Sequence, residues 1–177
     1  MHIFLTGLRQ VGKSTLLRRV LAEYPTLRLG GFRTVTAADV PGAFGSVYIF
    51  PAAGPYVPGD DCRVAVRLGP SRGVRAYPAV FEHRGVELLE GAENVDLILM
   101  DEIGFLEEDA ARFSGRVMEL LDGGTPVFGV VRGTEETPLL RFVRTHPKVR
   151  LIEVTEENRE RLFPEVSALL REALSDT

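Results

Sequence analysis

The sequence predicts an α/β fold with three layers, in which helices cover both faces of a mostly parallel sheet. Two observations lead to this prediction. Short apolar stretches alternate with stretches whose apolar residues recur at helical spacing, and this alternation favours a parallel sheet. A glycine-containing loop also separates the first predicted strand from the first predicted helix. The chain has 177 residues, a length that favours a single domain, 1–177, with a substantial core.

The first half of the chain contains three predicted strands and one predicted helix. Each strand is a short apolar run, and the helix carries its apolar residues on one face. In chain order these are the strand Ile3–Thr6, the helix Lys13–Tyr24, and the strands Leu27–Thr36 and Ser46–Phe50. Pro25 ends the helix, and Pro41-Gly42 is expected to form the turn between the last two strands. Residues 51–78 are rich in Pro and Gly, so we expect an irregular insert at about 36–78.

The second half alternates regularly between helix and strand. The run Val95–Met100 is almost entirely apolar, as expected for a parallel strand that is covered on both faces. A predicted helix near Glu82–Gly91 precedes it. The elements that follow are a helix near Asp109–Leu121, a strand at Pro126–Val131, a helix near Glu135–Thr145, a strand at Val149–Val154 and a helix near Glu156–Leu174. This order implies right-handed crossovers between parallel strands.

Composition narrows the class of protein. Hydrophobic residues make up 45% of the chain and charged residues 26%, which is the balance of a soluble globular protein. The net charge of −4 argues against nucleic acid as the main partner. The single cysteine, Cys62, can form no internal disulfide and fits a reducing cytosol. No apolar run approaches the ~18 residues of a membrane span, and no signal peptide precedes Gly7. We therefore expect a cytoplasmic protein without a membrane partner.

Residues 7–14 match the pattern G-x-x-x-x-G-K-[ST] at every position. In such a loop, backbone N–H groups and the helix N-terminus hold an anion, and glycines allow its close approach. An ordinary turn before a helix is the alternative, but the full pattern arises by chance in roughly one in a hundred chains of this length. We expect these residues to bind a nucleoside triphosphate: Gly7, Leu8, Arg9, Gln10, Val11, Gly12, Lys13, Ser14 and Thr15.

Three side chains of this loop have distinct expected roles. Lys13 would reach the β- and γ-phosphates and take part in catalysis, and the Ser14 hydroxyl would ligate Mg²⁺. Thr15 would contribute at the α-phosphate. The loop and its flanking elements together predict a P-loop NTPase fold with Mg²⁺ as the cofactor.

Two acidic residues end the apolar run Leu97–Glu102. In P-loop proteins an Asp at this point holds Mg²⁺, usually through water, and we assign this role to Asp101. Glu102 stands one residue further on, where a carboxylate can orient or deprotonate the attacking water. Such an acid separates nucleotide hydrolases from proteins that only bind nucleotide. Alternatively, both acids begin the solvated stretch that continues through residues 107–109.

Phosphoryl transfer also benefits from a cation that neutralises charge on the transferring group. The candidates are Arg9, Arg33, Arg132 and Arg159. Arg132 follows a predicted strand, so it would project at the edge of the sheet where ligands collect, and we assign it a catalytic role. A solvated surface position is the alternative for each. Asn158 and Arg159 could contact the base, or could cap the last helix together with Thr155.

Seven segments, taken together, resemble the cancer-related nucleoside-triphosphatase family. They are Thr6-Gly7 with Gly12–Leu16, Gly30–Thr34, Phe81-Glu82, Asp101–Glu107, Phe113, Pro126-Val127 and Thr155–Arg159. The likeness covers most of the chain and is weak from about Thr36 to Pro78. It implies Mg²⁺-dependent hydrolysis of ATP, GTP and other nucleoside triphosphates to the diphosphate and phosphate, with broad base tolerance and slow turnover.

The chain departs from this family in three places. The family usually has Pro and Gly at the positions of Arg9 and Gln10. Its basic stretch after Thr34 is replaced here by Val35–Asp39. Finally, Phe105-Leu106 replaces Lys-Met, so a positive charge beside the acidic pair is lost.

Two other functions fit parts of the sequence. A P-loop kinase for a nucleotide or small molecule would use the same loop and could close an arginine-rich lid near 63–84 over its acceptor. The arginines of this stretch are Arg63, Arg67, Arg72, Arg75 and Arg84. They could instead form a surface for an acidic partner, but a solvated charged face is the favoured interpretation. A GTP-dependent switch would fit the D-x-x-G pattern at Asp101–Gly104, but no guanine-reading N-K-x-D motif occurs in the chain.

Overall fold

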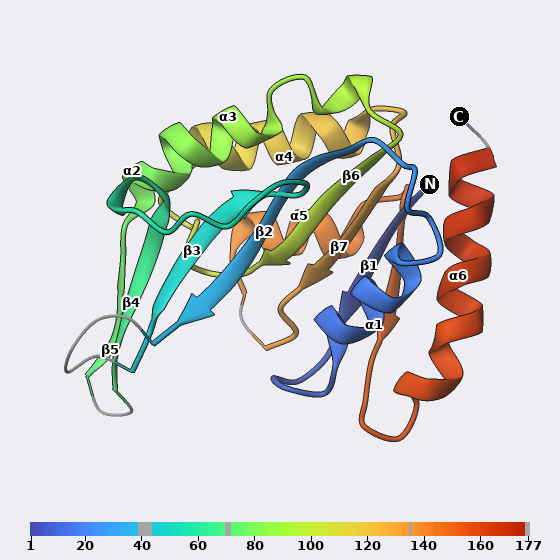
Figure 1. The fold of residues 1–177 in the computed structure, drawn as a ribbon, viewed down its shortest axis with the longest axis horizontal. Coiled ribbons are helices and arrows are strands. Elements are labelled where there is room, and N and C mark those ends of the chain that lie inside the picture. Colours follow the sequence, from blue (N-terminus) through green and yellow to red (C-terminus); the bar gives the residue numbers. More distant parts are fainter. Residues whose placement is uncertain (39–43, 70–71, 135, 176–177) are drawn as a thin grey trace.

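The computed structural model describes residues 1–38, 44–69, 72–134 and 136–175. Its strands form one sheet in the order β5-β4-β3-β2-β6-β7-β1-β8 (Figure 1). In chain order the strands are β1 His2–Thr6, β2 Leu29–Ala37, β3 Ser46–Pro51, β4 Arg63–Gly69, β5 Gly73–Ala76, β6 Leu97–Ile103, β7 Val127–Val131 and β8 Val149–Glu153. The strands β2, β6, β7, β1 and β8 are parallel, which confirms the predicted α/β fold.

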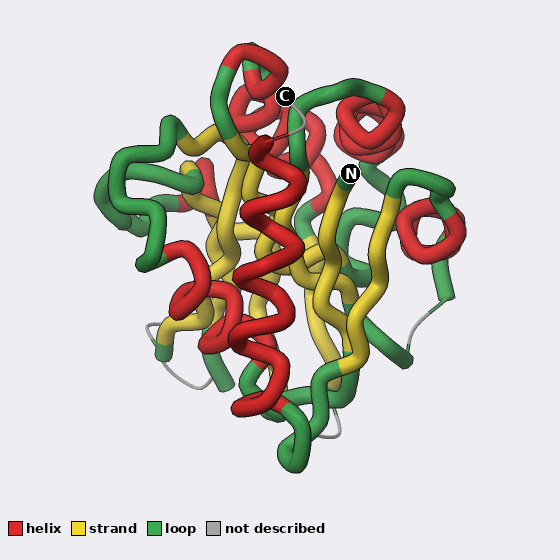
Figure 2. Tube along the Cα trace, turned by 90° about the vertical axis from the view of Figure 1, so that its right-hand side faces the viewer, coloured by secondary structure: helices red, strands yellow, loops and turns green. Residues whose placement is uncertain are grey.

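Helices cover both faces of this sheet, so the predicted three layers are present (Figures 1 and 2). The longer helices are α1 Lys13–Leu21, α4 Ala111–Asp122, α5 Pro138–Thr145 and α6 Arg159–Ser175. A continuous helical stretch is formed by α2 Pro78–Val80, the π-helical η2 Phe81–Gly85 and α3 Val86–Leu89. Short 3₁₀ turns lie at η1 Asp60–Cys62 and η3 Ala92–Asn94.

The strand β1, which lies between β7 and β8, contributes side chains to the apolar clusters on both faces of the sheet. Successive side chains of a strand point to opposite faces. Ile3 and Leu5 accordingly pack in a cluster with apolar residues of α1 and α6. Phe4, between them, joins the cluster on the opposite face, which includes apolar residues of α4 and α5. All three side chains are fully buried, as expected for a parallel strand between two helical layers.

The region predicted as an irregular insert contains regular structure. The strands β3, β4 and β5 extend the sheet beyond β2 by antiparallel pairing. The sequence predicts the strand at Ser46–Phe50 but neither β4 nor β5. The two strands are short and lie in a stretch rich in Pro and Gly, so the local sequence shows no clear strand pattern. The predicted turn at Pro41-Gly42 lies outside the described residues.

Several element boundaries differ from the predicted ones because of local capping. The helix expected near Glu82 begins at Pro78, a residue that suits the first helical position since it has no N–H to satisfy. The helix α5 begins at Pro138, after Thr137, whose Oγ1 accepts a hydrogen bond from the Leu140 N–H at 3.2 Å.

Among the described residues, no helix combines the length and the apolar character that a membrane span requires.

Candidate active site

The loop between β1 and α1 depends on glycine at two positions. Gly7 has φ +130°, and a Cβ atom there would lie 2.3 Å from the carbonyl oxygen of Val154. Gly12 has φ +103° and is the last residue before α1. Both conformations are accessible to glycine and strained for other residues. The loop therefore turns tightly, and α1 begins directly after it. A helix N-terminus in this position suits anion binding.

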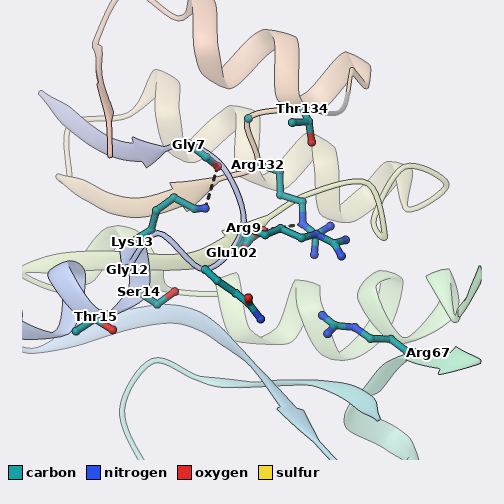
Figure 3. A pocket seen from close by; sticks show the side chains of 12 residues that line it. Gly7, Arg9, Gly12, Lys13, Ser14, Thr15, Arg67, Glu102, Arg132 and Thr134 are labelled. Atoms are coloured by element: carbon teal, nitrogen blue, oxygen red, sulfur yellow. Dashed lines mark hydrogen bonds and ion pairs between the residues drawn. The ribbon is translucent and has the colours of Figure 1, made fainter. Parts of the chain in front are cut away.

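The side chain of Lys13 folds back onto the loop that precedes α1. Its Nζ donates hydrogen bonds to the carbonyl oxygens of Gly7 at 2.9 Å and Leu8 at 2.6 Å. The side chain is buried, since it is only 8% exposed. These contacts keep the ammonium group in the concave side of the loop, where a bound phosphate chain would meet it (Figure 3).

Ser14 and Asp101 come together from distant parts of the sequence. The Ser14 hydroxyl donates a hydrogen bond to Asp101 Oδ1 at 3.1 Å. Asp101 stands in β6, beside Arg33 of β2 and Val130 of β7. Burial raises the pKa of Asp101 to about 6, with a contribution from the nearby charge of Glu102, while the Ser14 hydrogen bond acts in the opposite direction. The two oxygen-bearing side chains predicted to hold Mg²⁺ are thus in contact.

Glu102 occupies an irregularity in the pairing of β6 with β7. Asp101 pairs with Val130 and Ile103 with Val131, so Glu102 has no partner in the register. Irregularities of this kind re-aim a side chain away from the regular alternation of a strand. The strand expected to end at Met100 continues to Ile103. Glu102 is therefore carried by the sheet itself, and its side chain lines the cleft beside the phosphate loop.

Arg132 contacts Glu102 directly. Its Nε donates a hydrogen bond to Glu102 Oε1 at 2.6 Å, and the two side chains are 15% and 26% exposed. The Arg132 guanidinium also lies 5.1 Å from the centroid of the Phe105 ring, a cation–π contact. The Arg132 N–H donates to the Ile103 carbonyl at 3.0 Å, and Arg144 donates to the Arg132 carbonyl. Backbone and side chain of Arg132 are consequently both held in place.

Except for Asp101, these residues line one cleft of about 460 Å³ (Figure 3). Its predicted members are Gly7, Arg9, Gln10, Gly12, Lys13, Ser14, Thr15, Glu102 and Arg132, and its unpredicted members are Arg67, Gly133 and Thr134. Gly133 and Thr134 directly follow Arg132, so position in the chain could have indicated them. Arg67 comes from β4, and no local signal separated it from the other arginines of 63–84.

A smaller cavity of about 200 Å³ adjoins the cleft. It shares Ser14, Arg67, Glu102 and Arg132 with the cleft and is also lined by Asp101 and Glu107. Glu107 is almost completely buried and accepts a hydrogen bond from the Gly104 N–H. Burial raises the pKa of Glu107 to about 7, against the opposing effect of its backbone hydrogen bonds. Two carboxyl groups with different surroundings, those of Glu102 and Glu107, therefore lie at this end of the site.

Four of the remaining predicted side chains lie outside the cleft. Leu8 is exposed, and Val11 is buried in the hydrophobic core. Asn158 and Thr155 cap each other reciprocally, since Asn158 Oδ1 accepts the Thr155 N–H at 2.8 Å and Thr155 Oγ1 accepts the Asn158 N–H at 3.2 Å. The helix α6 accordingly begins at Arg159. Arg33 donates to the carbonyl oxygens of Pro51 and Ala52 and lines a separate cavity that it shares with Ser14 and Asp101.

Arg159 borders a third hollow on the outer side of the phosphate loop. This hollow has a volume of about 220 Å³ and is also lined by Gly12, Thr15 and Leu16. The Arg159 side chain lies close to Gly12, because a Cβ atom at Gly12 would be 3.2 Å from Arg159 Cδ. The hollow thus begins where the α-phosphate end of a nucleotide on the loop would be expected.

The arginines of residues 63–84 do not act as one group. Arg63 forms an ion pair with Asp60 at 2.6 Å, and Arg84 pairs with Glu87 at 3.1 Å. Arg72 and Arg75 are exposed. Among these five, only Arg67 lines the cleft.

A glycine loop between β1 and α1, with an acidic pair at the end of β6, defines a P-loop α/β protein. Residues 2–167 match the model of the NTPase family, and the chain belongs to this family. This membership confirms the expected resemblance and the expectation of an enzyme of the nucleoside-triphosphatase class.

Relatives of similar length support the assignment. The chain is 27% identical over 173 residues to nucleoside-triphosphatase THEP1 of Methanocaldococcus jannaschii, an alignment that covers 94% of this chain and 95% of that protein. It is 26% identical over 189 residues to the human cancer-related nucleoside-triphosphatase, with 93% and 94% covered. The crystal structure of THEP1 from Aquifex aeolicus superposes with a TM-score of 0.76 at 25% identity and covers 96% of this chain and 99% of that one.

Proposed function

We propose that this enzyme hydrolyses nucleoside 5'-triphosphates, ATP and GTP among them, to the diphosphate and phosphate in a reaction that depends on Mg²⁺. The observation that carries the proposal is the meeting of three parts in one cleft. These parts are the phosphate loop with Lys13, the contact between Ser14 and Asp101, and the pair formed by Glu102 and Arg132. The names of the relatives, which are nucleoside-triphosphatases, support the same reaction.

Ser14 and Asp101 suit Mg²⁺ because hydroxyl and carboxylate oxygens are ligands that this ion prefers. Their oxygens are 3.1 Å apart at the end of the phosphate loop. No group of three or more acidic, His or Cys side chains suited to a metal occurs among the described residues. Two protein ligands fit an ion that completes its shell with water and substrate phosphates. Bound there, Mg²⁺ would neutralise charge on the β- and γ-phosphates.

The remaining roles in the reaction belong to groups of the protein. The loop N–H groups and Lys13 hold the β- and γ-phosphates in line for attack. Glu102 orients a water molecule and accepts its proton as the water oxygen bonds to the γ-phosphorus and the bond to the bridging oxygen breaks. Arg132 lies beside Glu102 and faces the same cleft, where its guanidinium stabilises charge on the transferring group.

Broad tolerance for the base belongs to the same proposal. Asn158 is one candidate for contact with the base, but its Oδ1 accepts the Thr155 N–H and its Nδ2 donates to the Glu153 carbonyl at 2.9 Å. Its amide group is therefore engaged in capping α6. Arg159 remains beside the loop, and its guanidinium can stack on any base without reading hydrogen-bond edges.

The test is a phosphate-release assay with ATP, GTP, CTP and UTP, each with and without Mg²⁺ and with no phosphoryl acceptor added. We expect release from all four, with Mg²⁺ required. Lys13→Ala is the control, and it should lose activity because the ammonium group next to Gly7 and Leu8 is gone. If the wild-type protein released phosphate only when an acceptor alcohol or nucleotide was added, the enzyme would be a kinase instead.

A further inference from the structure

The antiparallel strands beyond β2 bring one cation to the catalytic cleft. Arg67 stands in β4, and its side chain extends into the space that Arg9, Glu102 and Arg132 face (Figure 3). The backbone at Arg67 is fixed by the sheet region, because its N–H donates to the Gly45 carbonyl at 2.8 Å and its carbonyl accepts the Phe44 N–H at 2.7 Å. A strand holds a side chain more precisely than a loop does.

The charges around Arg67 favour an anion. Burial lowers the pKa of its guanidinium, and repulsion from Arg9 and Arg132 lowers it further, while Glu102 acts in the opposite direction. Arg67 makes no side-chain hydrogen bond or ion pair with the part of the chain that the structure describes. The side chains that line the cleft thus include three guanidinium groups and the carboxylate of Glu102. Their mutual repulsion would be relieved by a polyphosphate bound between them.

The position of Arg67 distinguishes between the phosphates. Arg67 lines both the cleft and the smaller cavity next to it. That cavity includes Ser14, Asp101 and Glu102 but neither glycine of the phosphate loop. Arg67 therefore lies at the end of the cleft where the oxygens proposed to hold the metal and the acid proposed to activate water are found.

We propose that Arg67 is a catalytic residue that binds the γ-phosphate, and that the strands β3–β5 serve to carry this cation to the site. The proposal rests on the hydrolase function proposed above. A planar guanidinium can bind two phosphate oxygens at once, and Arg67 would contact the equatorial oxygens of the transferring group. It would act together with Arg132, which is held by Glu102 in the same cleft.

The test compares Arg67→Ala, Arg67→Gln and Arg67→Lys with Arg75→Ala. Arg75 is exposed on the neighbouring strand β5 and lies outside the cleft, so its variant is a matched control. Turnover of Mg-ATP and the binding of Mg-ADP and of Mg-ATP with a non-hydrolysable β,γ-bridge are measured for each protein. We expect Arg67→Ala to lower kcat about a hundredfold, as removal of one stabilising group in a transition state does.

Binding separates a contact with the γ-phosphate from a structural role. The Arg67→Ala and Arg67→Gln variants should bind the non-hydrolysable triphosphate about tenfold more weakly and the diphosphate almost as well as wild type, since only the triphosphate has the contact. Arg67→Lys, which keeps the charge, should recover part of the loss. Equal losses for both nucleotides in Arg67→Gln, or unchanged kcat in an active enzyme, would overturn the proposal. A wild-type protein that released no phosphate would instead overturn the hydrolase function itself.

Discussion

Arg132, which follows β7, and Glu102, which stands near the end of the neighbouring strand β6, form an ion pair at 2.6 Å inside the cleft. The residue proposed to activate water is thus bound to the residue proposed to stabilise the transferring phosphate. The ring of Phe105 lies against Arg132 on the same strand-end surface.

Substitution of Glu102 by Gln should leave nucleotide binding intact and lower turnover about 10²- to 10⁴-fold, because the amide cannot accept a proton from water. Nucleotide binding is measured by calorimetric titration with a non-hydrolysable triphosphate, and turnover is measured by phosphate release. The Gln side chain can still accept the hydrogen bond from Arg132. If Glu102 only formed the ion pair with Arg132, the substitution would therefore lower turnover by less than this. A turnover close to wild type would exclude Glu102 as the base.

Substitution of Arg132 by Ala removes the guanidinium beside Glu102. We expect kcat to fall about 10²- to 10³-fold, which is the range for loss of one group that stabilises a transition state. Arg144→Ala is an informative comparison. Arg144 donates to the Arg132 carbonyl and pairs with Glu136, so its loss should loosen the site and lower kcat less than loss of Arg132 itself. The opposite ranking would show that Arg132 acts only as part of the scaffold.

Asp101→Asn should raise the Mg²⁺ concentration that gives half-maximal activity by about 10- to 100-fold, as loss of a residue that orients metal ligands does. Acid should mimic this substitution in the wild-type enzyme. The pKa of Asp101 is raised to about 6 by burial, so its carboxylate becomes protonated as the pH falls from 8 to 5. The Mg²⁺ requirement should therefore rise over this range in the wild type and remain flatter in the variant. A parallel pH dependence in both proteins would point to another group.

Glu107 should make the fold less stable at high pH. Its pKa rises from 4.5 to about 7 on folding because the side chain is buried, so the folded state binds the proton more tightly than the unfolded chain. Stability from this group is therefore complete at low pH and is lost as the pH rises from about 4.5 to about 7, by at most about 3 kcal/mol.

The comparison of wild type with Glu107→Gln isolates this contribution. The amide cannot ionise but can still accept the Gly104 N–H. Urea denaturation at pH 5 and pH 8 gives the free energy of unfolding of each protein. The wild type should lose more stability between the two pH values than the variant. The pKa of Asp101 is raised in the same way in both proteins. Its contribution to the pH dependence of the unfolding free energy therefore cancels when the two proteins are compared. An equal loss would mean that Glu107 ionises normally in the folded state.

Local sequence was sufficient to predict the phosphate loop, the acidic pair and the alternation of strands and helices in the second half of the chain. The loop is eight consecutive residues, and a strand covered on both faces is apolar at almost every position. Lys13, Ser14 and Glu102 could be assigned roles from the sequence for the same reason, because each stands at a defined place in a short motif.

The tertiary structure decides which arginines reach the site, whereas the cap formed by Asn158 and Thr155 is a contact between near neighbours in the sequence. Arg67 belongs to β4, which pairs with the preceding strand β3 and the following strand β5, and nothing in the local sequence distinguishes Arg67 from Arg63 or Arg75. Glu102 faces the cleft because the register between β6 and β7 shifts at its position. Strand register and the convergence of charges across a sheet exist only in the folded chain, whereas loops and helix caps depend on neighbours in the sequence.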